Sequence, residues 1–583
     1  MFSAISASAL NNLRPASEVM KLERLGSMFA SRLSFVRSLM RKMITEQWQI
    51  RNTVFDLDSA GHGLAVYRIT TPANCYHCVI FSRDLAPELR SDRVIAEAWD
   101  VTFALVEGEV EDSLLEQMAA NVPLQEAGRQ HPRVLVLSRA NKSLRNFSQF
   151  AAALAAGQQP DPAWLTAVGY LYRTTAVYGN GKFGMADFAR LERNSDFNRP
   201  FAVQMLAVYV LRQFSIDQLN YLAKVKSPEQ AVPLHPELQR YLGVGNSTGL
   251  GMAPFLINHP QLIQQWVYGR ERALASARKE PANARTHSKL RELMARALKH
   301  LQQTRTEDKD QTLRNQETIG SVAEVVNWLD RTAAHPTLYE ELISWAREHC
   351  SLEAQELINT MLIELYPELL DGLEDELGCR ESMELQPDMK ARQLRDLITD
   401  KFGWALSYRE NCPEDNYWFW YRSAEKEEPR LGIRANESGA EKEAALAIGP
   451  RISRCHAKLE SFLERSPSAM VVEFLMAHPE QKECVRRIQT LGETPYGEIR
   501  ANLWHRDMKP MHLLRTKLSF FGASRFDPKS DRWVRITLFQ GAPLAFELNS
   551  PQRSPEQLDD WGFPLEPHLD SGEIGETSQG EAP

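Results

Sequence analysis

Cysteine is scarce in this sequence, with seven residues in a chain of 583. They are scattered along the chain, at Cys75, Cys78, Cys350, Cys379, Cys412, Cys455 and Cys484. An odd and sparse set does not provide the regularly spaced pairs of a disulfide framework. The composition therefore argues against a small disulfide-stabilised secreted protein, and it predicts a reducing compartment, the cytoplasm.

Long apolar runs and an excess of basic residues are also missing. No stretch of 18 or more apolar residues occurs, so no membrane span is expected. The formal net charge is −8, whereas nucleic-acid-binding domains usually carry a basic surface. We therefore expect neither a membrane nor a nucleic acid among the partners.

Several short motifs of enzymes and metal sites are absent. The sequence contains no Gly-x-Ser-x-Gly nucleophile elbow, no protein-kinase signature set and no P-loop spacing. Cys75, His77 and Cys78 lie close together, but a zinc site requires further ligands, and no second pair follows. In a strand, Cys75 and His77 would also face one side and Cys78 the other. We predict no metal site from these residues, and the cofactor stays unassigned.

The residues that are present predict an α+β fold that is predominantly α-helical. A large helical central region is flanked by smaller mixed α/β lobes on its N- and C-terminal sides. The predicted segments are an amphipathic helical segment (1–49), an α+β lobe with antiparallel strands (50–142), a helical body (143–408), a C-terminal α+β lobe (409–549) and an acidic disordered tail (550–583).

These assignments depend on local sequence patterns. The runs "TVFDLD", "GLAVYRITT" and "YHCVIFS" are broken by turn residues, which predicts an antiparallel meander. The run "FAVQMLAVYVLRQFSIDQLNYLA" has apolar residues at helical spacing. The basic, amphipathic stretch 24–43 predicts a docked helix, with a targeting segment as the alternative. The polar segment 276–318 fits either a long exposed helix or a mobile connector.

Two glycine-dense segments fall inside the predicted helical body, and we expect each to be a loop between helices rather than part of a βαβ unit. "RTTAVYGNGKFGMADF" contains Asn180 and Lys182, and "GVGNSTGLGMAPFLINHP" contains Asn246, Ser247 and Thr248. Glycine lets a ligand approach the backbone, and free N–H groups at a helix start favour anions. These five residues are predicted to bind a carboxylate or a phosphate. The alternative is that the glycines form packing turns and the hydroxyl groups cap helices.

Three residues in or beside these loops are candidates for proton transfer. His259 follows the second loop, and its near-neutral pKa range suits general acid or base chemistry. Tyr178 and Lys182 in the first loop are the rival proton carriers. A histidine at the start of an apolar helix is also a common hydrogen-bonded structural group, and this alternative stays open.

A third feature is the aromatic and charged stretch "NYWFWYRSAEKEEPRLGIR". Arginine binds carboxylates in a bidentate manner, and aromatic walls exclude water. We predict that Arg422 and Arg430 bind a substrate acid and that Glu425 orients them or acts as a base. A buried strand followed by a solvated turn would explain the same residues.

These features predict an enzyme that acts on a small anionic metabolite, a carboxylic acid above all, by general acid/base chemistry of the lyase, hydratase or isomerase type. Two alternatives stay open. One is a non-catalytic interaction or scaffold protein, in which the glycine segments are packing turns. The other is a nucleotide-binding regulator, in which the loops hold phosphates. The oligomeric state is not determined by these patterns.

Overall fold

The structure is a computed structural model. It describes residues 13–30, 32–86, 99–121, 131–161, 164–165, 169–174, 176, 194–199, 201–249, 260–370, 373, 385–407, 448–492, 494–498, 515, 519–528, 533–548 and 553–569.

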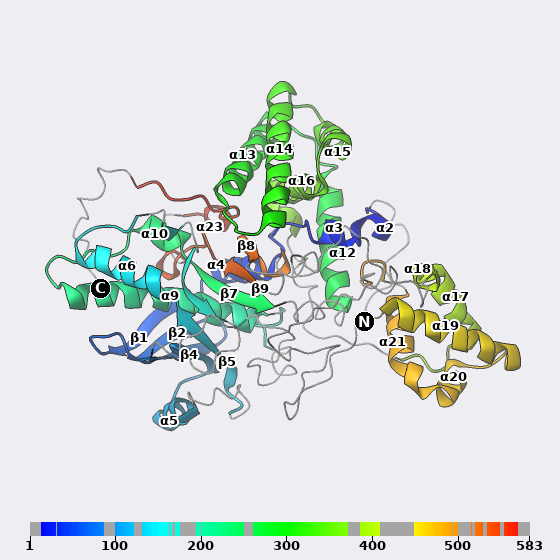
Figure 1. The fold of residues 1–583 in the computed structure, drawn as a ribbon, viewed down its shortest axis with the longest axis horizontal. Helices are drawn as coiled ribbons and strands as arrows, with labels where there is room; N and C mark the ends of the chain where they lie inside the picture. The colour runs from blue at the N-terminus through cyan, green and yellow to red at the C-terminus, as the bar shows by residue number, and fades with distance from the viewer. Residues whose placement is uncertain are drawn as a thin grey trace.

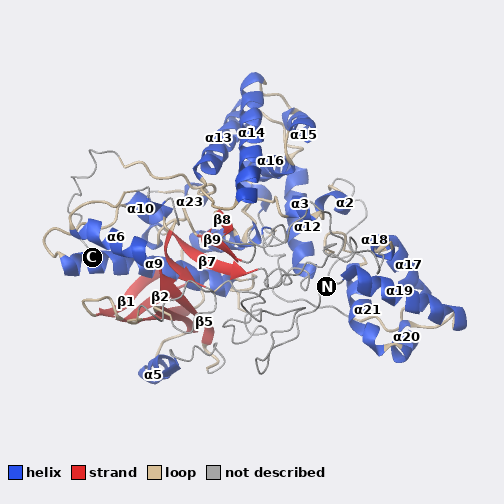
Figure 2. Cartoon of the chain, viewed as in Figure 1, coloured by secondary structure: helices blue, strands red, loops and turns tan. Residues whose placement is uncertain are grey.

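A single nine-stranded sheet organises the described part of the chain (Figure 2). Its strand order is β1-β2-β3-β4-β5-β6-β7-β9-β8. The strands are β1 (Gln49–Leu57), β2 (Gly63–Thr70), β3 (Cys75–Ser82), β4 (Val101–Glu107), β5 (Val134–Lys142), β6 (Tyr170–Thr174), β7 (Gly243–Gly249), β8 (Arg525–Pro528) and β9 (Trp533–Leu538). Neighbouring strands run antiparallel, except that β6 and β7 are parallel. The α+β class is thus confirmed.

The predicted antiparallel meander is confirmed as β1, β2 and β3. The β1–β2 turn is held by the carboxylate of Asp58, which accepts hydrogen bonds from the backbone N–H groups of Ala60 and His62. Gly61 lies in this turn with a φ of 81°, in the left-handed region that favours glycine. Helix α5 (Asp112–Asn121) follows β4.

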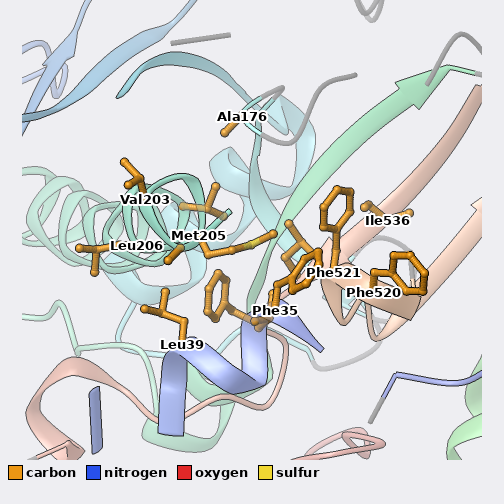
Figure 3. Packing of buried hydrophobic residues seen from close by; sticks show 14 of the residues in the cluster. Phe35, Leu39, Ala176, Val203, Met205, Leu206, Phe520, Phe521 and Ile536 are labelled. Carbon is orange, nitrogen blue, oxygen red and sulfur yellow. The ribbon is translucent and has the colours of Figure 1, made fainter. Parts of the chain in front are cut away.

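Helix α9 (Ala202–Lys226) covers one face of the sheet and is buried along most of its length. It packs on β4 to β7, on α4 (Phe35–Thr45) and on α6 (Leu144–Ala155). In Figure 3, side chains from α4, α9, β9 and residues 520–521 converge in one apolar cluster. The helix predicted from the periodicity of this segment is confirmed. Of stretch 24–43, only the part from Phe35 on is a docked helix, because residues 26–30 and 32–34 are not helical.

The remaining helices form two groups beside the sheet (Figure 1). The helical arm at the top of the view has its own apolar core and consists of α13 (Ala284–Gln303), α14 (Lys309–Arg331), α15 (Leu338–His349) and α16 (Leu352–Leu365), reached through α12 (Pro260–Ala277). The group at the right consists of α17 (Ala391–Lys401), α18 (Gly403–Leu406), α19 (Ile448–Arg465), α20 (Val471–Ala477) and α21 (Lys482–Leu491). Short helices are α2 (Ala16–Val19), α3 (Leu22–Leu25), α10 (Pro236–Tyr241) and α23 (Pro555–Asp559).

Three expectations about the chain's organisation need correction. The segment 143–408 is not purely helical, because it contributes strands β6 and β7 to the sheet. The polar segment 276–318 falls on two helices, α13 and α14, instead of one helix or a connector. The expected disordered tail is wrong for residues 553–569, because Leu558 and Trp561 are buried and Asp559 pairs with buried arginines. Its acidic composition is neutralised by partners that lie far away in the sequence.

Strands β8 and β9 come from the predicted C-terminal lobe, yet they extend the sheet begun by the N-terminal strands. The sheet therefore connects three of the predicted segments. Among the described helices, none has the length and apolar character required to cross a bilayer.

Candidate ligand site at the ends of two parallel strands

Strands β6 and β7 bring the two glycine-dense segments to one edge of the sheet. Thr174, the last residue of β6, is in register with Asn246 near the end of β7. Because the strands are parallel and about 5 Å apart, the chain leaves both of them at the same edge. Residues 177–193 follow β6 and residues 250–259 follow β7, and both ranges lie outside the described residues.

The expectation that these segments join helices outside a βαβ unit is therefore wrong. The first segment begins with the end of β6, the second begins with β7 itself, and β6, α9 and β7 form a strand–helix–parallel strand unit. Strand β6 has only five residues, which is too short for a clear periodicity. Strand β7 reads "GVGNSTG", and its glycines disfavour a strand on propensity alone.

Two of these glycines serve close packing within the sheet. A Cβ on Gly245 would lie 2.6 Å from the ring of Tyr170, and one on Gly243 would lie 2.5 Å from the carbonyl oxygen of Leu538. Both separations are too short for any other residue without movement of the neighbour. Gly243 and Gly245 therefore serve close packing between strands, in a strand rather than in the packing turns named as the alternative.

Asn246 is the most unusual polar residue at this edge. Its side chain is fully buried, and neither its Oδ1 nor its Nδ2 atom has a hydrogen-bond partner in the structure. Leaving a buried polar group unsatisfied costs about 1–3 kcal/mol, so such groups in native proteins call for an explanation. Asn246 is in register with Ile536, whose side chain belongs to the core on the α9 face (Figure 3). Its amide therefore lies on the face that α9 covers.

The start of α9 contributes a second unsatisfied amide to this region. Ala176, just beyond β6, and Val203, in the first turn of α9, belong to the same apolar core (Figure 3). Gln204 in the same turn is 2% exposed, and its Oε1 atom has no hydrogen-bond partner. No side chain caps this helix start, which is preceded by Phe201 in the left-handed region with a φ of 60°. Amide groups and a positive helix end therefore occur together at the edge where β6 ends.

The opposite face of the same edge carries arginines. Arg173 on β6 is in register with Asn141 and Gly245, and Arg535 on β9 is in register with Ser247. Arg139 precedes Asn141 by two residues, so its side chain is on the same face. Three half-buried arginines thus share one face across four adjacent strands, β5, β6, β7 and β9.

The guanidinium group of Arg139 is partly buried beside an aromatic ring. Burial lowers the pKa of Arg139, whose guanidinium lies 4.7 Å from the centre of the Trp99 ring. The period-2 pattern of each strand could have suggested a common face for Arg139 and Arg173. It could not have placed Arg535 there, because the β7–β9 pairing joins distant segments.

The predicted site residues can be placed only in part. Asn246 is at the edge of the sheet, as described, and for Ser247 and Thr248 only the backbone is described, within β7. The other predicted residues lie outside the described part of the chain: Tyr178, Asn180, Lys182, His259, Arg422, Glu425 and Arg430.

A cleft of about 130 Å³ lies elsewhere, between the helical arm, residues 26–30 and β8. Its charged side chains are already paired with the protein. Arg515 binds Glu353 at 2.6 Å. The ring nitrogens of His300 lie 2.7 Å from the carbonyl oxygen of Pro564 and 3.1 Å from that of Ser524. We therefore regard this cleft as a junction between structural elements, and the edge of β6 and β7 as the candidate functional site.

Comparison of the chain with protein-family models, with curated proteins and with solved structures found no match. The inference of function therefore depends on the geometry and chemistry of the site.

Proposed function

We propose that the protein is an enzyme that binds a small anionic metabolite, a carboxylic acid in the first instance, at the carboxyl ends of β6 and β7. The observation that supports this proposal is the parallel pairing of these two strands. This pairing brings the strand ends that lead into both glycine-dense segments to one edge of the sheet. The buried amide of Asn246 and a row of arginines lie at the same edge. Ligands of α/β sheets commonly bind in such a position, beyond the carboxyl ends of parallel strands.

In this proposal the described residues supply recognition. Arg139, Arg173 and Arg535 attract the acid from one face of the sheet, and Asn246 offers a donor and an acceptor from the other. The segment after β6 adds Asn180 and Lys182, and the end of β7 adds Ser247 and Thr248, all of which were predicted from the sequence. Arg422, Arg430 and Glu425 would close the site from the C-terminal segment.

Proton transfer is assigned to Tyr178, Lys182 or His259. Abstraction of a proton next to a carboxylate is the first step of many eliminations and isomerisations, and it requires a positioned base and a group that stabilises the developing charge. The arginines and the Asn246 amide would supply the second requirement.

Nucleotide binding is the second candidate, and a specific observation favours it. Gly179, Gly181 and Gly184 have the Gly-x-Gly-x-x-Gly spacing of phosphate-binding turns, and they follow strand β6. In dinucleotide-binding folds this motif also opens a helix, and residues 177–193 lie outside the described part of the chain. The spacing therefore supports phosphate binding less strongly than the row of arginines supports acid binding.

A thermal-shift experiment with the full chain tests ligand binding. The ligands are a panel of small carboxylic acids, inorganic phosphate and nucleotides, and the variants are Arg173→Gln, Arg535→Gln and the control Arg51→Gln. Arg51 is an exposed arginine on β1, at the other end of the same sheet. A ligand at about 100 times its Kd stabilises the protein by about 2.7 kcal/mol. We expect a carboxylic acid to raise the Tm of the wild type and of Arg51→Gln, but not of the other two variants.

The panel also separates the alternatives. A shift with nucleotides alone would favour the regulator, and no shift with any ligand would favour the scaffold protein. An equal shift in Arg173→Gln and Arg51→Gln would place the site elsewhere.

Catalysis is tested by isotope exchange, which does not require the product to be known. The protein is incubated in D₂O with the acids that bind, and NMR follows the loss of the proton next to the carboxylate. We expect exchange with the wild type, and its loss in at least one of Lys182→Ala, His259→Ala and Tyr178→Phe. Binding without exchange in the wild type would contradict the acid/base mechanism.

A further inference from the structure

We propose that Cys75, His77 and Glu109 form a zinc site on the face of the sheet that bears α5. Cys75 Sγ, a ring nitrogen of His77 and a carboxylate oxygen of Glu109 all lie within 4.8 Å of one another. Cysteine and histidine come from β3, and the glutamate comes from the segment after β4. This third ligand is more than 30 residues away in the sequence, which explains why the pattern around Cys75 did not reveal a site.

The strand geometry puts the ligands on a common face. Cys75 and His77 are two residues apart on β3, so their side chains have the same direction, whereas Cys78 is buried in the main core. The backbone N–H of Gly108 donates a hydrogen bond to the carbonyl of Cys75 at 2.8 Å. Glu109 is therefore attached directly to a residue that is fixed against β3.

The histidine is oriented for coordination. Its Nδ1 atom lies 2.8 Å from the carbonyl oxygen of Gly108. A carbonyl can only accept, so Nδ1 carries the hydrogen, and in the neutral ring Nε2 keeps its lone pair. This is the arrangement in which metal-binding histidines are commonly held by a second partner.

The Nε2 atom faces a carboxylate in a way that a cation would explain. It lies 3.5 Å from Oε2 of Glu109, so that in the neutral ring a lone pair opposes a negative oxygen. A Zn²⁺ ion at its usual distances of about 2.0–2.2 Å from both atoms, in tetrahedral geometry, separates nitrogen and oxygen by about 3.4 Å. The observed separation matches this value.

Two arginines hold the glutamate in place. Arg68 binds Oε1 of Glu109 at 3.0 Å, so that the other carboxylate oxygen, Oε2, faces His77. Arg133 donates to the backbone carbonyl of Glu109 at 2.7 Å. Such outer contacts orient ligands in metal sites.

The ligand set selects the metal. A thiolate and an imidazole favour zinc among the common divalent ions, whereas magnesium and calcium prefer oxygen ligands. Three protein ligands leave the fourth tetrahedral position for water, as in zinc sites that remain open to exchange.

Cobalt titration of the full chain tests the proposal, because Co²⁺ replaces Zn²⁺ and its thiolate bond gives a charge-transfer absorption. The chain is first freed of metal by a chelator. We expect one Co²⁺ per chain, with a thiolate band that disappears when Zn²⁺ is added. The band should vanish in Cys75→Ser and persist in the control Cys350→Ser, which removes a half-buried thiol from the helical arm.

The other ligands are tested by affinity. His77→Gln and Glu109→Gln should each raise the Kd for Co²⁺ at least tenfold. Glu109 is 66% exposed, so its substitution does not disturb the core, and the Tm of the metal-free variants checks the fold. No thiolate band in the wild type, a band that persists in Cys75→Ser, or an unchanged Kd in Glu109→Gln would each overturn the proposal and leave a histidine–carboxylate ion pair.

Discussion

Helices α9 and α16 are both buried along most of their length. Buried ion pairs with distant segments hold α16, whereas the buried Arg212 of α9 donates to backbone carbonyls such as that of Leu242. Helix α9 packs on the sheet through apolar side chains such as Leu206 and Phe214. Helix α16 has apolar contacts within the helical arm, and it also presents Glu356 and Glu364 to buried arginines of other segments. Apolar contact is not directional, whereas a buried ion pair is satisfied in one arrangement only. The comparison indicates that the sheet core supplies stability and that the α16 contacts also specify how the arm is attached.

The first ionic cluster connects the N-terminal segment with the arm. Arg14 contacts Glu271 and Glu356, at 2.7 Å in each case, and Arg24 contacts Glu356 at 2.9 Å. Arg270 on α12 lies 3.3 Å from Glu356. Glu356 is fully buried and therefore depends on these cations for its solvation.

The second cluster lies two helical turns further along α16 and connects the C-terminal segment. Arg37 contacts Glu364 at 2.6 Å and Arg32 contacts it at 3.0 Å. Arg32 also pairs with Asp559 of α23. Segments from both ends of the described chain thus meet on one helix.

Substitution of Glu356 by alanine should have the largest effect. It leaves the buried Arg14 and Arg270 with one shared carboxylate, Glu271, instead of two. Removing one partner of a buried ion pair typically costs about 3–5 kcal/mol. We expect the free energy of unfolding to fall by that amount in denaturant titrations. A change in the free energy of unfolding below about 1 kcal/mol would show that water solvates the cluster. The ion pairs of α16 would then not distinguish it from α9.

Leu206→Ala tests the apolar side of the comparison. Leu206 is fully buried in the main core, and leucine-to-alanine changes in such positions cost about 2–5 kcal/mol. Unlike the effect of Glu356→Ala, this loss should be the same at pH 2.5 and pH 7, because no ionisable group is removed. Unfolding measured at both values distinguishes the two kinds of contact, and a marked pH dependence for Leu206→Ala would contradict the assignment.

Acid should weaken the ionic contacts selectively. Burial alone would raise the pKa of Glu356, but Arg14, Arg270 and Arg24 outweigh it and hold this pKa at about 2. An unfolded glutamate has a pKa near 4.3. The resulting stabilisation, about 3 kcal/mol, is present above pH 4.3 and is lost as the pH falls toward 2. We expect the stability of the wild type to fall more steeply between pH 4.3 and pH 2.5 than that of Glu356→Gln, and equal slopes would contradict this account.

Local structure could be predicted from the sequence where local residues decide it. The turn residues around Gly61 and the period-2 runs identified the β1–β3 meander, and the helical spacing identified α9. Strand β7 was missed because local propensity opposed it. Its glycines are required by Tyr170 and Leu538, which lie in other strands.

The candidate sites depend on contacts between distant segments, which a single sequence does not reveal. Asn246 and the glycine-dense segments could be named, but not the parallel pairing that brings them to one edge. Glu109 could not be assigned to Cys75 and His77, because the β3–β4 register decides that contact. The ionic clusters are a further case, since Arg14 and Glu356 are 342 residues apart.

Glu340→Ala should have the smallest effect and is the matched control for Glu356→Ala. Glu340 is on α15 of the same arm and binds Arg278 at 2.6 Å, but its side chain is 52% exposed. Water solvates both partners when the pair is broken, so exposed pairs contribute less than about 1 kcal/mol, and salt screens them. We expect a change within that limit, measured by the same denaturant titration, which shrinks further at high salt. A loss as large as that of Glu356→Ala would mean that burial is not what separates the two glutamates, and the contrast would then have to be sought in the number of arginines around each.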